Sequence, residues 1–370
     1  MSDYLLHTEK LTVGYDKKPL IENIEIGVDR GKILTLIGPN GAGKSTILKS
    51  ITRQLEVLAG TVVLEGKELR QLSGKETAQK MALVTTERVK PELMNCIDVV
   101  AMGRYPYTGR LGLLSQEDRE KAAAALDMVN GAELAQKDFS RISDGQRQRV
   151  MLARALCQEP EIIILDEPTS FLDIRYKLEL LDILKGLVRR DHLAVIMSLH
   201  ELDLAQKISD TVVCVGGNRV DKAGPPEEIF TSEYIHQLYG VSAGSYNGEF
   251  GSLELASPKG EAEVFVIGGG GKGIPVYRKL QREGIPFAAG VLHENDLDYP
   301  VAKALSENIV TEEAFEPISQ INLEKAAKLM MSCQKVICPV EKFGTMNRAN
   351  QKLLGLAKEK GLLVLDIINQ

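Results

Sequence analysis

The sequence predicts an α/β protein that carries two parallel-sheet domains in one chain. Apolar runs of strand length alternate with amphipathic segments of helical length, as in repeated βαβ units. The chain has 370 residues, more than one typical domain needs. Residues 242–261 are rich in Gly and Ser, which is typical of a linker. We therefore predict a first domain over residues 1–241 and a smaller α/β domain over residues 262–370.

The composition is that of a soluble globular protein. Hydrophobic residues make up 44% of the chain and charged residues 26%, and the net charge is −6. This charge, with no long basic run, argues against nucleic acid as the main partner. No apolar run approaches the roughly 20 residues of a membrane-spanning helix, and residues 1–10 lack the apolar core of a signal peptide. Any membrane role is therefore expected to come through partner proteins.

The cysteines are scattered and form no C-x-x-C pair, which is typical of reduced thiols in the cytosol. They are Cys96, Cys157, Cys214, Cys333 and Cys338. A metal or redox pair formed by Cys333 and Cys338 stays open as an alternative, although no His lies nearby in the sequence.

Apolar periodicity places the elements of the first domain in order. Residues 4–13 alternate enough for an edge strand, and residues 21–28 for a second strand. The remaining strands are expected at 33–37, 60–64, 82–85, 161–165 and 194–199, followed by two short strands that end near 220. Helices are expected at 47–51, 116–129, 143–156, 175–190 and 201–209, and residues 97–130 are mostly helical with an interruption at 103–109.

A glycine-rich segment stands between the apolar strand at 33–37 and the helix that follows. Its pattern, G-x-x-x-x-G-K-S, is typical of a phosphate-binding loop rather than of an ordinary glycine-rich turn. The glycines let the backbone curl until successive N–H groups point inward, and the helix N-terminus adds partial positive charge. Lys44 is expected to reach the β- and γ-phosphates of a nucleoside triphosphate, and the Ser45 hydroxyl to hold Mg²⁺. The loop comprises Gly38, Pro39, Asn40, Gly41, Ala42, Gly43, Lys44, Ser45 and Thr46.

Two adjacent carboxylates end the apolar strand at 161–165. A central strand that emerges beside a phosphate-binding loop is where a Mg²⁺ ligand is needed. Asp166 is expected to hold the metal, and Glu167 to orient the attacking water or to accept a proton from it. The alternative, a strand that ends in two solvated acids, is weakened by the phosphate-binding loop in the same chain.

Four motifs follow one another in the first domain. They are the Gly38–Thr46 loop, Ile142-Ser-Asp-Gly-Gln146, Leu165-Asp-Glu-Pro-Thr-Ser-Phe-Leu-Asp173 and His200. In this order and spacing they resemble the nucleotide-binding subunit of ATP-binding-cassette transporters, over about residues 3–241. Gly103-Arg-Tyr-Pro-Tyr107 and Pro168-Thr-Ser-Phe-Leu-Asp-Ile174 are similar to the branch that imports iron–siderophores, haem and cobalamin. The resemblance implies a P-loop ATPase domain with a helical subdomain.

The resemblance also implies roles for single residues. Tyr15 would stack on the adenine, His200 would contact the γ-phosphate near Glu167, and Asp173 would cross a dimer interface. The signature that would contact ATP held by the opposite subunit comprises Ser143, Asp144, Gly145 and Gln146. A Ser-x-Gly turn at a helix N-terminus is an anion site that needs a phosphate from elsewhere, which implies a head-to-tail homodimer.

Each of these roles has a structural alternative. Tyr15 could pack on the edge of the sheet, and His200 could be a core histidine that the backbone satisfies. Asp173 could cap the helix that begins near Arg175, with or without a role at the interface.

Two positions depart from the family pattern. The family signature usually reads Leu-Ser-Gly-Gly-Gln, whereas Asp144 here should repel a γ-phosphate unless it faces away or meets a base such as Arg147. The family also has a Gln after the strand at 82–84, which binds Mg²⁺ and signals to the permease. Thr86 stands at that position and is followed by Glu87. Either could supply an oxygen ligand with a different reach, and hydrolysis itself is expected to remain.

A second glycine-rich segment opens the C-terminal domain. The strand at 263–267 leads into Gly268-Gly-Gly-Gly-Lys-Gly273 and a helix to about residue 283. This contains G-x-G-x-x-G in the context of a doubly wound, Rossmann-like domain, with Gly268, Gly270 and Gly273 as a possible ligand loop. Further strands are expected at 287–292, 308–311, 335–339 and 362–366. Three alternatives stay open: a dinucleotide site, a site for another anionic metabolite, or a tight turn in a regulatory or dimerising domain.

Together these features predict a subunit that hydrolyses ATP with Mg²⁺ to energise an importer of iron–siderophore, haem or cobalamin-type substrates. The resemblance implies integral membrane permease subunits and an extracytoplasmic substrate-binding protein as partners. It also implies a peripheral location at the cytoplasmic face of the membrane, held only through the permease. One alternative is a soluble ATP-switched protein that acts on ribosomes or DNA, which a single cassette without a heptad run disfavours. Another alternative makes the C-terminal domain an enzyme that uses NAD(P).

Overall fold

The computed structural model describes residues 4–85, 93–109 and 112–364, and it divides into two compact units between Tyr234 and Ile235. Both units contain parallel sheets with helices, so the predicted α/β class is confirmed. The predicted linker, residues 242–261, includes a two-stranded hairpin of β12 (Ser245–Asn247) and β13 (Ser252–Glu254). The domain limits that the sequence suggests stay a prediction.

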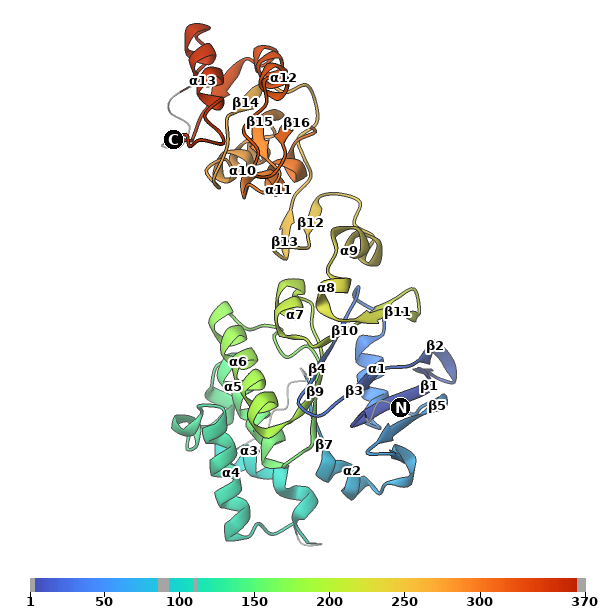
Figure 1. Cartoon of the computed structure of the whole chain (residues 1–370). Helices are drawn as coiled ribbons and strands as arrows, with labels where there is room; N and C mark the ends of the chain where they lie inside the picture. The colour runs from blue at the N-terminus through green and yellow to red at the C-terminus, as the bar shows by residue number, and fades with distance from the viewer. Residues whose placement is uncertain (1–3, 86–92, 110–111, 365–370) are drawn as a thin grey trace. The chain divides into compact units, whose positions relative to one another are not determined.

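The first unit is organised around a six-stranded sheet (Figure 1). Its order is β11-β10-β4-β9-β8-β7, in which β11 runs antiparallel to β10 and the other neighbours are parallel. The strands are β4 (Ile33–Ile37), β7 (Met81–Val84), β8 (Ile162–Leu165), β9 (Ala194–Ser198), β10 (Thr211–Gly216) and β11 (Arg219–Gly224). Every residue of β4, β8 and β9 is buried, because both faces of the sheet are covered.

A second, antiparallel sheet has the order β2-β1-β5-β6, with β3 also paired to β1. Its strands are β1 (Leu6–Tyr15), β2 (Lys18–Ile24), β3 (Gly27–Val28), β5 (Ala59–Leu64) and β6 (Lys67–Glu68). The prediction of an edge strand at residues 4–13 is wrong, because β1 pairs with β2 on one side and with β5 on the other. Alternation reports which face of a strand is buried, not how many of its edges are paired. The single strand predicted at 21–28 is divided into β2 and β3.

Helix α1 (Lys44–Ile51) packs between the two sheets. Ile47, Leu48 and Ile51 share one core with Leu36 from β4 and Val62 from β5. The helix that begins at the phosphate-binding loop is therefore fixed on both sides by apolar packing, and its N-terminus cannot shift without disturbing this core.

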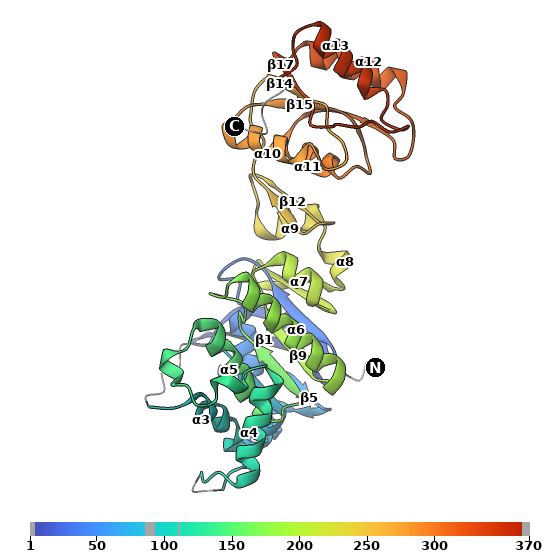
Figure 2. The same ribbon diagram turned by 90° about the vertical axis from the view of Figure 1, so that its left-hand side faces the viewer.

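The remaining helices of the first unit form a helical subdomain and a cover for the six-stranded sheet (Figure 2). The subdomain consists of α3 (Cys96–Ala101), α4 (Gln116–Met128) and α5 (Asp144–Cys157), which pack on one another. Helices α2 (Gly74–Lys80), α6 (Ile174–Asp191), α7 (Leu202–Ile208) and α8 (Pro226–Ile229) contact strands of that sheet, and α9 (Ser232–Tyr239) spans the division between the units. Short 3-10 helices lie at η1 (Leu69–Gln71), η2 (Met102–Tyr107), η3 (Ala132–Leu134) and η4 (Phe139–Arg141).

A buried arginine joins η2 to α4 and α5. Arg104 is 3% exposed, and its guanidinium donates to the carboxylate of Asp118 at 2.9 Å and to the carbonyl of Cys157 at 2.8 Å. The hydroxyl of Ser115 and the guanidinium of Arg104 lower the pKa of the Asp118 carboxyl to about 2. This carboxylate stabilises the subdomain in its ionised form.

We expect the first unit to lose stability as the pH falls from about 4 toward 2, and the Asp118→Asn variant to show a flatter dependence. The pKa of Asp118 is lower in the folded chain than the ~3.9 of an unfolded chain, so its contribution is complete above that value and disappears on protonation. The effect is on the order of 2 kcal/mol. Urea unfolding followed at several pH values measures it. An Asn variant with the same slope as the parent would contradict the assignment.

The second unit is a four-stranded parallel sheet with helices on both faces. The order is β16-β15-β14-β17, formed by β14 (Val264–Val266), β15 (Phe287–His293), β16 (Asn308–Glu312) and β17 (Lys335–Ile337). Helices α10 (Ile274–Glu283) and α11 (Asp298–Leu305) pack on the face of Val264 and Val266, and α12 (Gln320–Met331) and α13 (Asn350–Glu359) on that of Phe265. The predicted doubly wound arrangement is confirmed. Of the strand predicted at 362–366, Leu363 forms one bridge with Val336, and residues 365–366 lie outside the described residues.

Candidate functional site

The predicted phosphate-binding loop forms a tight curl at the N-terminus of α1. Gly38, Gly41 and Gly43 have positive φ angles of 146°, 78° and 99°. A Cβ atom on Gly38 would lie 2.0 Å from the carbonyl oxygen of Val215, so glycine is required there for space as well as for conformation. The curl leaves the amide end of α1 facing the interior of the loop, where an anion binds favourably.

Lys44 is the first residue of α1 and is 4% exposed. Its Nζ atom donates to the carbonyl oxygens of Gly38 at 2.7 Å and Pro39 at 3.1 Å. Burial lowers the pKa of the Lys44 ammonium, while the carboxylates of Glu167 and Asp166 oppose this shift. The ammonium therefore lies inside the loop, within the field of the two predicted acids.

Asp166 follows β8 and meets the phosphate-binding loop, as predicted. Its Oδ1 atom accepts hydrogen bonds from the hydroxyl of Ser45 at 3.0 Å and from the hydroxyl of Ser198 at 2.7 Å. Hydroxyl and carboxylate oxygens at this separation fit Mg²⁺, which takes one or two protein oxygens together with phosphate oxygens and water.

Glu167 and His200 form a pair at the same edge of the sheet. The Nε2 atom of His200 lies 2.6 Å from Oε1 of Glu167, and the hydroxyl of Ser170 donates to Oε2 at 3.2 Å. Glu167 has a positive φ of 49°, an uncommon conformation for a residue with a side chain. Its backbone N–H donates to the hydroxyl of Ser198 at 2.9 Å. The conformation is thus held by the neighbouring strand and directs the carboxylate toward His200.

Ser198 is the functional residue that the sequence analysis missed. It is the last residue of β9, is fully buried, and links the side chain of Asp166 to the backbone of Glu167. The one feature of the sequence that points to Ser198 is its position at the end of an apolar strand, two residues before His200. A serine in such a strand is an ordinary observation until the pairing of β8 with β9 brings it opposite the acids.

Tyr15 lies beside the phosphate-binding loop. It ends β1, its side chain is 51% exposed, and its hydroxyl lies 3.1 Å from that of Thr46. The ring is fixed at one end and accessible at the other, as adenine stacking requires.

The signature residues form the first turn of α5. Ser143 caps this helix: its hydroxyl accepts from the N–H of Gln146 at 3.3 Å, and the Gln146 side chain returns to the N–H of Ser143 at 3.2 Å. Arg147 donates to the carboxylate of Asp144 at 2.9 Å, so this acid meets the base that the sequence analysis named. Asp173 caps α6 by accepting from the N–H of Tyr176 at 3.0 Å. Thr86, the predicted replacement for the family glutamine, lies outside the described residues.

The glycine loop of the second unit has a different environment. The carboxylate of Asp298, which is fully buried, accepts from the N–H groups of Gly269 at 2.6 Å, Gly273 at 2.8 Å and Ile274 at 3.0 Å. Asp296 accepts from the N–H of Gly270 at 2.8 Å. Carboxylates of the chain itself thus occupy the N–H groups that would hold a phosphate, which favours the tight-turn alternative.

A Cβ atom on Gly268 would lie 2.1 Å from the hydroxyl oxygen of Tyr277, and one on Gly273 would lie 2.4 Å from it. Both glycines are therefore needed for close packing of this loop against α10, whether or not a ligand binds.

Lys44, Asp166, Glu167 and His200 thus follow the carboxyl ends of β4, β8 and β9. Comparison with known proteins identifies the family. The model of the ABC transporter family matches residues 21–170, and that of the MJ0874 family matches residues 287–369. The chain is 42% identical over 289 residues to an uncharacterized ABC transporter ATP-binding protein of Methanocaldococcus jannaschii, covering 78% of this chain and 100% of that protein. The chain belongs to the ATP-binding proteins of ABC transporters, and it binds and hydrolyses ATP.

Two further similarities extend this finding. The iron(3+)-hydroxamate import ATP-binding protein FhuC of Bacillus subtilis is 37% identical over 238 residues, 64% of this chain and 88% of that protein. The solved structure of an ATP-binding subunit of an ABC transporter is 27% identical, with a TM-score of 0.54, over 64% of this chain and 95% of that chain.

Among the described residues, no helix has the length and apolar character required to cross a bilayer.

Proposed function

We propose that this ATPase energises an importer whose substrate is an iron–siderophore, haem or a cobalamin-type compound. The observation that carries the ATPase mechanism is the convergence of Lys44, Asp166 and Glu167 at one edge of the sheet. The substrate class is supported by the similarity to FhuC and by the motifs around Tyr105 and Phe171. Substrate choice itself would lie in partner proteins.

Hydrolysis in this proposal is an in-line attack of water on the γ-phosphate of ATP, which breaks the bond to the β-phosphate oxygen and releases ADP and inorganic phosphate. Ser45 and Asp166 would hold a bound Mg²⁺, which would supply positive charge that offsets the charge of the phosphates. Lys44 neutralises charge on the β- and γ-phosphates. Glu167 orients the water and takes up its proton, and His200, paired with it at 2.6 Å, fixes the direction of the carboxylate. Each of these groups acts within one chain.

The binding site for the γ-phosphate would be completed by a second copy of the chain. Ser143 is exposed at the N-terminus of a helix of 14 residues, an arrangement that favours an anion. In a head-to-tail dimer this turn would contact ATP held on the partner's loop, and Asp173 would lie at the same interface. The presence of Arg147 beside Asp144 supports the contact, because the ion pair offsets the negative charge near the phosphate.

We expect Arg147→Ala to raise the ATP concentration needed for dimerisation about three- to tenfold, since the positive charge of Arg147 would no longer offset the negative charge of Asp144 near the phosphate. The double variant Asp144→Gly with Arg147→Ala should return to the parent value. Size-exclusion chromatography across an ATP titration measures this. A double variant as weak as Arg147→Ala would show that the arginine acts through something other than Asp144.

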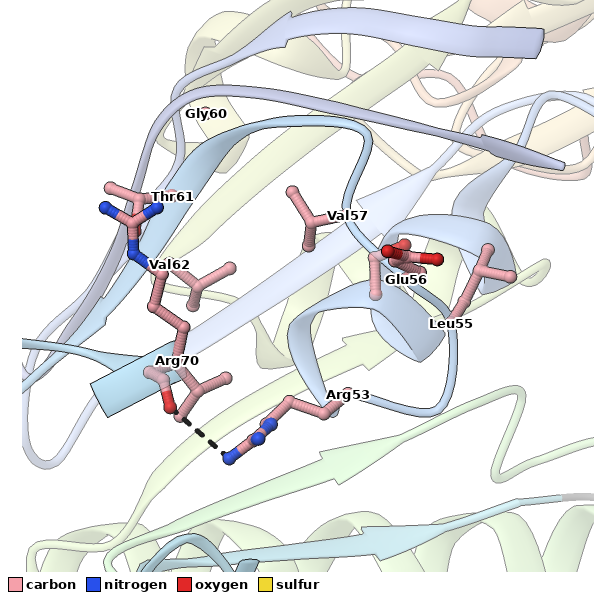
Figure 3. Close-up of a pocket in the computed structure, with 10 residues that line it drawn as sticks. Arg53, Leu55, Glu56, Val57, Gly60, Thr61, Val62 and Arg70 are labelled. Atoms are coloured by element: carbon pink, nitrogen blue, oxygen red, sulfur yellow. Dashed lines mark hydrogen bonds between the residues drawn. The ribbon is translucent and has the colours of Figure 1, made fainter. Parts of the chain in front are cut away.

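Permease subunits are proposed to bind at the C-terminal end of α1. A groove of about 550 Å³ there includes Gln54, Thr85, Arg154 and Gln158. Arg53 lines both this groove and a second pocket of about 420 Å³, where its guanidinium donates to the carbonyl of Leu69 at 3.4 Å (Figure 3). The phosphates and the groove would thus lie at opposite ends of one helix that the core fixes, so a change at one end would be transmitted to the other.

Co-purification tests the importer directly. The tagged full chain is isolated from detergent-solubilised membranes and its companions are identified by mass spectrometry. We expect a polytopic membrane protein in equal amount, an extracytoplasmic substrate-binding protein when transport complexes are trapped, and an iron or cobalt chelate among bound small molecules. This would place the chain at the cytoplasmic face of the membrane through its permease. Ribosomal proteins or DNA as the sole companions would contradict the proposal.

A further inference from the structure

We propose that Tyr176 is a positioning residue that joins the signature turn, residues 143–146, to the segment that ends at Asp173. Both segments would reach the partner's ATP in the proposed dimer, so this inference rests on that dimer. Tyr176 lies in the first turn of α6, whereas the signature turn begins α5. It contacts both, and it would keep them in one arrangement when the two chains meet.

The first contact is between the Tyr176 ring and Gly145. A Cβ atom on Gly145 would lie 2.5 Å from two ring carbons, so the ring lies directly against the glycine backbone. Gly145 does not have a positive φ, which means that it is glycine for space and not for conformation. It is also buried, although Ser143 and Asp144 before it are exposed. The ring of Tyr176 therefore covers the signature glycine from within its own chain.

The second contact is made by the backbone of the same residue. The N–H of Tyr176 donates to Oδ1 of Asp173 at 3.0 Å and so caps α6, a helix of 18 residues. One residue thus fixes the side chain of Asp173 with its N–H group and the backbone of Gly145 with its ring.

Two arginines hold the ring in place. The guanidinium carbons of Arg149, from α5, and of Arg175, from α6, each lie 5.9 Å from the ring centroid of Tyr176. These contacts and the packing on Gly145 use the aromatic ring, and the cap uses the backbone. A phenylalanine should therefore replace Tyr176, whereas an aliphatic or small residue should not.

The position of Tyr176 predicts different effects on dimerisation and on ATP binding by the single chain. Lys44, Ser45 and Tyr15 belong to the proposed ATP site on the chain's own loop, and Tyr176 belongs to the segments that would bind the partner's ATP. Removal of the ring should weaken dimerisation and leave ATP binding to the single chain intact. A residue needed only for folding would not make this distinction.

The test uses the full chain with Glu167→Gln, so that hydrolysis does not consume the ATP. Tyr176→Ala and Tyr176→Leu are compared with Tyr176→Phe. Dimerisation is followed by size-exclusion chromatography with light scattering across an ATP titration, and binding to the monomer by a fluorescent ATP analogue at low protein concentration. We expect the Ala and Leu variants to need about tenfold more ATP to dimerise, and the Phe variant and all monomer affinities to stay within about twofold of the parent.

Ala and Leu variants that dimerise like the parent would overturn the inference, and so would an equal loss of monomer binding and dimerisation. A Phe variant as weak as the Ala variant would show that the hydroxyl, not the ring, is responsible. If the Glu167→Gln parent itself fails to dimerise with ATP, the proposed dimer is contradicted and so is this inference. If the parent dimerises and the Tyr176 variants dimerise equally well, only this inference is contradicted.

Discussion

Replacement of Glu167 by Gln is expected to abolish steady-state ATP hydrolysis and to leave ATP bound in a stable dimer. The amide keeps the size of the carboxylate but cannot take up a proton from water, and it no longer repels the γ-phosphate. Loss of a general base typically costs 10²- to 10⁴-fold in rate, so we expect a fall of at least about 100-fold. Phosphate release measures turnover, and size-exclusion chromatography in ATP measures the dimer.

Glu201→Gln is the matched control. Glu201 is also a partly buried glutamate near the carboxyl edge of the sheet, but its carboxylate accepts from the hydroxyl of Thr169 at 2.8 Å and pairs with Lys177. We expect this variant to keep hydrolysis within about threefold of the parent. Retained turnover in Glu167→Gln would remove Glu167 from its role, and an equal loss in both variants would indicate general disruption of this edge.

The site could be predicted where its residues are close together in the sequence. The loop from Gly38 to Thr46 and the pair Asp166–Glu167 each stand within one strand-to-helix or strand-to-loop junction, so local pattern determines their geometry. Parallel pairing then brings their carboxyl ends to one edge of the sheet. The Arg147–Asp144 pair could be predicted for the same reason, because residues three apart share one face of a helix.

Contacts between distant residues could not be predicted in this way. Ser198 meets Asp166 across 32 positions, and its role depends on the register of β8 against β9, which no local pattern states. The central place of β1 depends likewise on pairing with β5, far along the chain. In the second unit, the carboxylate of Asp298 lies 25 to 29 positions from the glycine N–H groups that it occupies. The glycine pattern records close backbone approach but not the group that approaches.

Replacement of Asp298 by Asn is expected to destabilise the second unit by about 3 kcal/mol, because a side-chain amide cannot accept from all three N–H groups and a buried donor is left without a partner. Burial raises the pKa of the Asp298 carboxyl, while the N–H groups of Gly273 and Gly269 oppose this. Hydrogen exchange in the full chain measures the effect over β14 and α10, and ATP hydrolysis reports whether the first unit is intact.

The Asn variant also separates the remaining interpretations of this loop. If Asp298 is a structural anion, the variant loses protection over β14 and α10 and gains no affinity for inorganic phosphate, and Asp296→Asn, at a half-buried position, has a smaller effect. If the loop is a ligand site that Asp298 covers, removal of the charge should leave N–H groups that bind phosphate with little loss of protection. Asp298 is buried, and three backbone N–H groups donate to its carboxylate, which favours the role of a structural anion. This carboxylate supplies the negative charge that a bound phosphate would otherwise bring to the glycine loop.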